Sequence, residues 1–171
     1  ASVEPMQRPV RFEHTRFLGD KRTQLVYDVD DWSDASVIDE IVAGYGAAAR
    51  RLYQAGLDGV EVVASHGYLP AQFINPRVNR RTDGYNGDLQ QRLRFLREVI
   101  AAVRANTDEQ FIIGLRISAD ERDPEGLTED EALAALAALD AGEAMDYVSV
   151  VAGTSATLAG WLGWQGLVGW A

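Results

Sequence analysis

The chain lacks cysteine altogether and has only two histidines among its 171 residues. Without a thiol it can hold no disulfide, no thiolate nucleophile and no cysteine-ligated metal or iron–sulfur centre within this chain. The same absence is compatible with a cytoplasmic enzyme, and cytoplasmic is the location we predict.

Positive charge is also scarce. Lysine and arginine total 16 against 26 aspartate and glutamate residues, so the formal net charge is -10 and the isoelectric point about 4.6. An acidic surface argues against a nucleic-acid interface, which needs a basic stripe. Arg77, Arg80 and Arg81 form a small basic cluster, which we interpret as part of a solvated loop.

Familiar catalytic and phosphate-binding signatures are missing as well. No GxGxxG, Walker, HExxH or GxSxG pattern occurs. Residues 147–171 carry no charge, yet Gly, Ser, Thr and Gln dilute their hydrophobicity, so we predict no membrane span. The Trp- and Gly-rich tail at 160–171 receives no structural assignment.

An alternation of strand-like and helix-like segments is what the chain does contain. Helical apolar spacing covers about 37–55, 89–105 and 129–139. Short apolar runs at 60–64, 111–117 and 146–151 predict strands, the first of them buried on both faces. Strands separated by helices predict a parallel α/β sheet, either doubly wound or about three consecutive βα units of a TIM (β/α)8 barrel. Residues 1–36 stay unassigned, apart from a short strand near 24–29.

The ends of the predicted helices carry recognisable signals. Gly56 suits the left-handed residue that closes the first helix. Asp88 with Gln91, and Thr128 with Glu131, have the spacing of a capping box at the start of the second and third helices.

The chemically richest stretch is Ser65-His66-Gly67-Tyr68, where the first predicted strand ends. Ligands bind at the carboxyl ends of parallel strands, and Arg116 stands near the end of the next strand. A phenol can donate a proton, an imidazole can orient a substrate and a guanidinium can stabilise negative charge. The same residues also fit a scaffold, with Tyr68 as a core aromatic and Arg116 paired to a structural carboxylate.

Several motifs in order resemble one family. They are HGYLxxQF, NxRxDxYxG, an arginine-rich helix and IGLRIS, followed by DExxxxGL and DYVSVVAGT. Together they resemble the Old Yellow Enzyme, or NADH:flavin oxidoreductase, family, and most closely its branch with 2,4-dienoyl-CoA reductase and trimethylamine dehydrogenase. The likeness covers roughly 37–159.

The resemblance implies that 37–159 is part of an FMN-binding (β/α)8 barrel, a central fragment of a longer oxidoreductase. In such an enzyme the substrate exchanges hydride with the flavin N5. Tyr68 matches the family's proton donor, His66 matches the second member of its substrate-binding pair, and Arg116 matches the arginine beside the flavin N1 and O2. A metal site is not expected in this chain.

Partners follow from the same resemblance. A small-molecule substrate is expected, together with a nicotinamide cofactor or an electron-transfer partner. Members of the branch also carry a 4Fe-4S cluster and an FAD or NAD(P)H region, which would lie outside this chain. Neither a nucleic acid nor a membrane is expected as a partner, and an oligomer is left open.

One departure from the family pattern bears on the reaction. Val63 stands where the first member of the substrate-binding pair is usually His or Tyr. The substitution leaves room for oxidative demethylation of an N-methylated amine beside the alternative, reduction of an activated alkene such as an enone or a dienoyl thioester. Two interpretations of another class stay open. One is a non-catalytic fragment or assembly module derived from the barrel. The other is a flavin-free enzyme using His66 and Tyr68 as acid and base.

Overall fold

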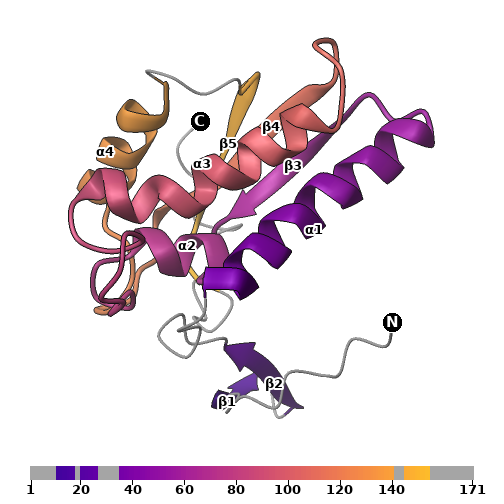
Figure 1. The fold of residues 1–171 in the computed structure, drawn as a ribbon. Coiled ribbons are helices and arrows are strands. Elements are labelled where there is room, and N and C mark those ends of the chain that lie inside the picture. Colours follow the sequence, from indigo (N-terminus) through magenta and orange to yellow (C-terminus); the bar gives the residue numbers. More distant parts are fainter. Residues whose placement is uncertain (1–10, 18–19, 27–34, 141–144, 155–171) are drawn as a thin grey trace, which may run out of the picture.

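The structure is a computed structural model that describes residues 11–17, 20–26, 35–140 and 145–154. Its elements, in chain order, are β1 (Arg11–Phe17), β2 (Asp20–Val26), α1 (Ala35–Gln54), β3 (Gly59–Ala64), α2 (Leu69–Ile74), α3 (Leu89–Ala105), β4 (Ile112–Asp120), α4 (Glu129–Asp140) and β5 (Tyr147–Ala152). They form a two-stranded antiparallel hairpin and a three-stranded parallel sheet (Figure 1).

The parallel sheet has the order β3-β4-β5, so neighbours in the sheet are also consecutive strands in the chain. Its register aligns Val62 with Leu115 and Leu115 with Val148. Right-handed crossovers that always advance in one direction place every helix on the same face, whereas a doubly wound sheet reverses and covers both faces. Figure 1 shows α1 and α3 together on one side of the strands. Of the two predicted architectures, consecutive units of a (β/α)8 barrel are therefore confirmed, and the doubly wound sheet is not.

The core lies between the sheet and the helices. Leu115 and Ile117 of β4 face Phe73 of α2 and Phe95 of α3, and all four side chains are buried. The rings of Phe73 and Phe95 stack with centroids 4.3 Å apart. Fully burying an apolar side chain of this size contributes roughly 1.5–3 kcal/mol, so this cluster anchors α2 and α3 to the sheet.

The other face of the sheet is open among the described residues. Glu61 and Val63 of β3 point to it and are only partly buried, so the prediction that this strand is buried on both faces is wrong. Val148 and Val150 of β5 lie in register with Leu115 and Ile117 on the helix-facing side, yet both are exposed. In a complete barrel, further strands and helices cover both surfaces.

The predicted helix ends are confirmed. Asp88 accepts a hydrogen bond from the Gln91 N–H at 2.9 Å, and the Gln91 side chain accepts from the Asp88 N–H at 3.0 Å. The Thr128 N–H donates to the Glu131 carboxylate at 2.9 Å, which is the corresponding contact at α4. Gly56 has φ +82°, the left-handed conformation expected after α1.

The predictions for the two ends of the chain are corrected in one case and lie outside the described residues in the other. The strand predicted near 24–29 is β2, which begins at Asp20 and pairs with a strand that was not predicted, β1. Apolar and polar residues alternate too irregularly in Arg11–Phe17 to predict a strand, and only the pairing with β2 shows that this segment is one. Residues 27–29 and the tail at 160–171 lie outside the described residues.

The basic cluster is only partly a solvated loop, because Arg80 is exposed but Arg77 and Arg81 make internal contacts. Arg81 is buried and forms an ion pair with Asp83, and Arg77 donates to Glu131 of α4 at 2.9 Å. The buried Asn79 side chain donates to the carbonyl oxygens of Phe73 and Tyr85 at 2.8 and 2.9 Å. The motif NxRxDxYxG is thus the internal framework of the long loop between α2 and α3.

Candidate active site at the strand ends

A tight turn follows β3 and carries the two predicted catalytic residues. The Tyr68 N–H donates to the Ser65 carbonyl oxygen at 3.0 Å, and both central residues have positive φ, +58° at His66 and +72° at Gly67. Positive φ at both central positions is typical of a type I′ turn. Glycine adopts this conformation freely, but a histidine does so at a cost of about 1 kcal/mol, so other contacts must hold the turn.

The His66 side chain reaches the end of β5. Its Nδ1 lies 3.1 Å from the carbonyl oxygen of Gly153, and its backbone N–H donates to the Ser118 hydroxyl at 3.0 Å. Since a carbonyl oxygen only accepts, Nδ1 carries the proton in this contact, and in a neutral imidazole Nε2 is then the basic nitrogen. His66 also forms a bridge with Thr154, so the three strand ends meet at this residue.

Tyr68 is 47% exposed, so the interpretation of this residue as a core aromatic is wrong. Its ring stands edge-on to the His66 ring, with the centroids 6.3 Å apart. The structure therefore brings the phenol and the imidazole together at the carboxyl end of β3. A group of either kind there can exchange a proton with a bound molecule.

Arg116 lies on the open face of β4, in register with Val63 of β3. Its Nε is 2.6 Å from a carboxylate oxygen of Glu61, so the prediction of a structural carboxylate partner is confirmed. The geometry is that of an ion pair without a hydrogen bond from Nε. The phenol of Tyr147 on β5 hydrogen-bonds to the same carboxylate. The pKa of this phenol is raised, mainly by desolvation and to a smaller extent by the negative charge of Glu61. The Arg116 side chain is still 41% exposed.

Sequence reasoning missed Glu121, the residue directly after β4. It is 2% exposed, its Oε1 accepts from the Gly67 N–H at 2.9 Å, and its Oε2 accepts from the Leu127 N–H at 2.8 Å. Burial raises the pKa of this carboxyl, and the two backbone donors and His66 act in the opposite direction. The motif DExxxxGL contains Glu121 and Leu127, so a signal was present, but only the structure connects it to the turn.

The open face carries a donor group for a bound molecule. The Arg116 side chain is 41% exposed and its guanidinium only donates, whereas its buried Nε lies against Glu61. A partly exposed guanidinium fits a bound group with acceptor atoms. The heteroatom edge of a flavin ring has such acceptors, which makes FMN compatible with the residues present.

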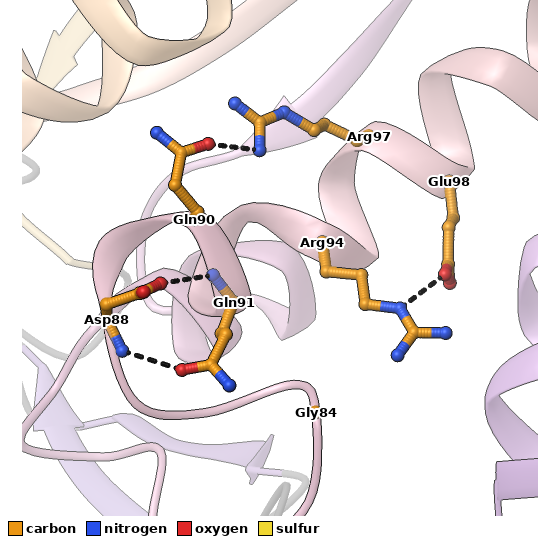
Figure 2. Close-up of a pocket in the computed structure, with 7 residues that line it drawn as sticks. All are labelled: Gly84, Asp88, Gln90, Gln91, Arg94, Arg97 and Glu98. Carbon is orange, nitrogen blue, oxygen red and sulfur yellow. Dashed lines mark hydrogen bonds and ion pairs between the residues drawn. The ribbon is translucent and has the colours of Figure 1, made fainter.

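A separate pocket lies on the outer side of α3. Its volume is about 450 Å³, and Figure 2 shows the residues that line it, which are Gly84, Asp88, Gln90, Gln91, Arg94, Arg97 and Glu98. Arg94 donates to Glu98 at 2.8 Å and Arg97 to Gln90 at 2.6 Å, so its polar groups bind one another. This pocket contains none of the residues at the strand ends, and we do not assign the reaction to it.

Metal chemistry and membrane insertion find no support in the described ranges. No cluster of three or more His, Asp or Glu side chains there has the arrangement of a metal site. None of the helices described between Ala35 and Asp140 combines the length and the apolar character needed to cross a membrane.

Comparison with known proteins points to the family that the motifs resemble. The model of the NADH:flavin oxidoreductase / NADH oxidase family matches residues 14–157. The N,N-dimethylglycine/sarcosine dehydrogenase of Chromohalobacter salexigens is 47% identical over 95 residues, which are 56% of this chain and 13% of that protein.

Two solved structures are similar in fold. A complex of 2-naphthoyl-CoA reductase with 2-naphthoyl-CoA matches with a TM-score of 0.70 and 25% identity, covering 88% of this chain and 22% of that one. The 6-hydroxypseudooxynicotine amine oxidase of Pseudomonas geniculata N1 matches with a TM-score of 0.64 and 31% identity, covering 71% and 18%. The chain thus spans less than a quarter of each of these three proteins.

Proposed function

Because the chain belongs to the NADH:flavin oxidoreductase / NADH oxidase family, we propose that it forms the substrate-side part of an FMN-dependent oxidoreductase. The observation that carries the proposal is the meeting of His66 and Tyr68 at the end of β3, with Arg116 on the open face of the adjacent strand. When bound, FMN supplies a site that accepts or donates hydride. Reduction of a substrate would draw its electrons from NADH or NADPH, whereas oxidation of a substrate would pass electrons from the flavin to an electron-transfer partner.

In this proposal each side chain has one task. His66 accepts a hydrogen bond from an N–H or O–H group of the substrate at Nε2, since Nδ1 is engaged with Gly153. Tyr68, with its exposed phenol, borders the bound substrate and supplies a proton only when the substrate is reduced. Arg116 places its positive charge beside the flavin edge where reduction builds negative charge, a fixed electrostatic stabilisation that costs no reorganisation during the reaction.

For the substrate we propose an N-methylated amine. Val63, beside Arg116 in the sheet, presents an apolar surface where a second polar side chain would grip a carbonyl oxygen, and an N-methyl group packs well on such a surface. Two of the similar proteins are, by name, a dehydrogenase of N,N-dimethylglycine and sarcosine and an amine oxidase. These names support amine oxidation for this chain.

Reduction of an activated alkene is the second candidate, and the exposed phenol of Tyr68 favours it. Adding hydride to an alkene leaves a carbanion that needs a proton, and Tyr68 can supply one. One similar protein is, by name, a reductase of 2-naphthoyl-CoA, which supports reduction as the second candidate. An iron–sulfur cluster or a second nucleotide site would belong to regions outside this chain.

The first experiment is a titration of the purified protein with FMN, followed by quenching of flavin fluorescence. Stoichiometric binding that weakens at least tenfold in Arg116→Ala supports the flavin site. Arg97→Ala is the matched control, because it removes a guanidinium that contacts Gln90 and the Ala138 carbonyl oxygen, away from the strand ends. Equal affinity in all three proteins would contradict the role of Arg116.

The second experiment separates the two substrates. Sarcosine and an enone are mixed anaerobically with the flavin-loaded protein, and the visible absorbance of the flavin is followed. Tyr68→Phe should slow alkene reduction by about 10²–10⁴, the usual contribution of a general acid, and leave amine oxidation within a few-fold. Alkene reduction without any amine oxidation would reject the proposed substrate and favour the second candidate.

A further inference from the structure

Gly67, which lies between His66 and Tyr68, is held at both of its backbone polar groups. The Gly67 N–H donates to Oε1 of Glu121 at 2.9 Å, and the Gly67 carbonyl oxygen accepts from the Gln72 side chain at 2.8 Å. Gln72 belongs to α2, which is anchored in the core, and Glu121 belongs to the loop after β4. These contacts fix a turn whose central residues both have positive φ.

The Glu121 side chain is itself fixed at its other oxygen. Oε2 accepts from the Leu127 N–H at 2.8 Å, and the Glu121 N–H donates to the Leu127 carbonyl oxygen at 2.9 Å. The Leu127 side chain is buried in the core. Residues 121–127 therefore form a closed loop, and it points one carboxylate oxygen at the turn that follows β3.

The chemistry of this contact requires a carboxylate. Each of its two oxygens accepts from a backbone N–H, and an ionised carboxylate is the side chain that offers acceptors at both positions. A glutamine would turn an NH2 group toward one of the two donors and leave that buried N–H unsatisfied, at a cost of roughly 1–3 kcal/mol. An aspartate is one methylene shorter and cannot span both donors.

From this geometry we propose that Glu121 is the positioning residue for His66 and Tyr68. It touches neither substrate nor cofactor in the proposed reaction. It acts through the Gly67 N–H, which sets the direction in which the imidazole and the phenol leave the turn. The consequence for the reaction rests on the proposed function, whereas the contact and its effect on the two rings can be measured without flavin.

The first measurement uses the unmodified chain. A through-hydrogen-bond scalar coupling between the Gly67 amide nitrogen and the Glu121 carboxyl carbon, measured by NMR, is expected. Nuclear Overhauser contacts between the His66 and Tyr68 rings, whose centroids are 6.3 Å apart, define the positioned state. A rapidly exchanging Gly67 amide with no coupling to Glu121 would overturn the proposal before any substitution is made.

Substitutions then test the effect on the rings and the reaction. In Glu121→Gln we expect amide exchange at Gly67 to rise at least tenfold relative to amides of β4, and the ring contacts to weaken. We expect kcat to fall about 10–100-fold, as misplaced catalytic groups do, with FMN affinity within threefold. Glu121→Asp should behave alike, and it replaces the glutamine variant if that protein does not fold.

The matched control is Glu98→Gln, the same chemical change on α3, at a carboxylate that contacts Tyr85 and Arg94. It should alter neither Gly67 exchange nor kcat. Equal effects of the Glu121 and Glu98 substitutions would show a general loss of stability and overturn the proposal. A third outcome separates the two proposals. If the unmodified protein neither binds FMN nor turns over substrate, and Glu121→Gln still loses the ring contacts, the proposed function is refuted but the positioning of His66 and Tyr68 by Glu121 is supported.

Discussion

The Nδ1 atom of His66, just after β3, lies 3.1 Å from the carbonyl oxygen of Gly153, just after β5. The contact passes over the end of β4, where the Ser118 hydroxyl receives the His66 N–H. A single residue thus ties together the carboxyl ends of three parallel strands. Its side chain serves the scaffold through Nδ1, and its other nitrogen is the one with a chemical role in the proposed site.

Replacement of His66 should separate these two tasks. Asparagine places an N–H donor near the position of Nδ1 and tolerates positive φ. We therefore expect the free energy of unfolding of His66→Asn to lie within about 1 kcal/mol of that of the unmodified protein. Glutamine is longer and disfavours φ +58°, so His66→Gln should lose about 1–2 kcal/mol. Urea denaturation of the three proteins gives these values. Equal stability of the two variants would show that the Gly153 contact contributes nothing.

The open face offers a test of close packing. A Cβ atom on Gly114 would lie 2.2 Å from a ring carbon of Tyr147, so Gly114→Ala must displace that ring and its contact with Glu61. We expect a loss of about 1–3 kcal/mol, typical of overpacking. In a Tyr147→Ala background the added methyl group meets no ring, and the loss should largely disappear. A double-mutant cycle by thermal unfolding measures the difference, and an unchanged cost in both backgrounds would contradict the assigned clash.

The cap of α3 can be tested without touching the core. Asp88→Ala removes the acceptor for the Gln91 N–H and should cost about 1 kcal/mol. Asp88→Ser keeps an acceptor at the same place and should cost a few tenths of that amount. Thermal unfolding of both variants decides the matter. If alanine and serine are equally stable at this position, the capping box does not stabilise the helix.

Local patterns predicted the repeating units well because their causes are local. Helical apolar spacing and the capping boxes depend on residues three or four positions apart, and each predicted helix or strand between 37 and 151 has its counterpart in the structure. His66, Tyr68 and Arg116 were found because ligand sites of parallel sheets lie at strand ends, a rule that needs only the strand positions.

The remaining features depend on partners far apart in the chain. Glu121 meets Gly67 across 54 positions, and Arg77 meets Glu131 across the same separation. No periodicity connects such pairs, and a charged residue in a loop usually faces water. Strand β1 and its pairing with β2 were missed for a similar reason, since the evidence is pairing between strands and β1 alone alternates poorly. The open face of the sheet follows from which strands are present, which composition does not reveal.

The ion pair of Arg77 with Glu131 makes a prediction about pH. The Arg77 guanidinium, followed by the Thr128 contacts, lowers the pKa of Glu131 from 4.5 to about 2. A carboxyl whose folded pKa is depressed stabilises the protein above its unfolded pKa, and this contribution is lost as the pH falls through the folded value. We therefore expect the free energy of unfolding at neutral pH to be about 1–2 kcal/mol higher for the unmodified protein than for Glu131→Gln. The difference is no larger because solvent screens a partly exposed ion pair.

The difference should shrink as the pH falls from 4.5 toward 2, and urea denaturation across that range measures it. Glutamine can still accept from the Thr128 N–H, as the third residue of a capping box often does, so this substitution isolates the ion pair from the cap. Arg77→Met is the complementary variant, because it removes the cation and returns the Glu131 pKa toward its ordinary value. In that background, Glu131→Gln should have little effect at any pH. A stability difference that stays constant from neutral pH to pH 2.5 would assign the stabilisation to packing at α4 instead of charge.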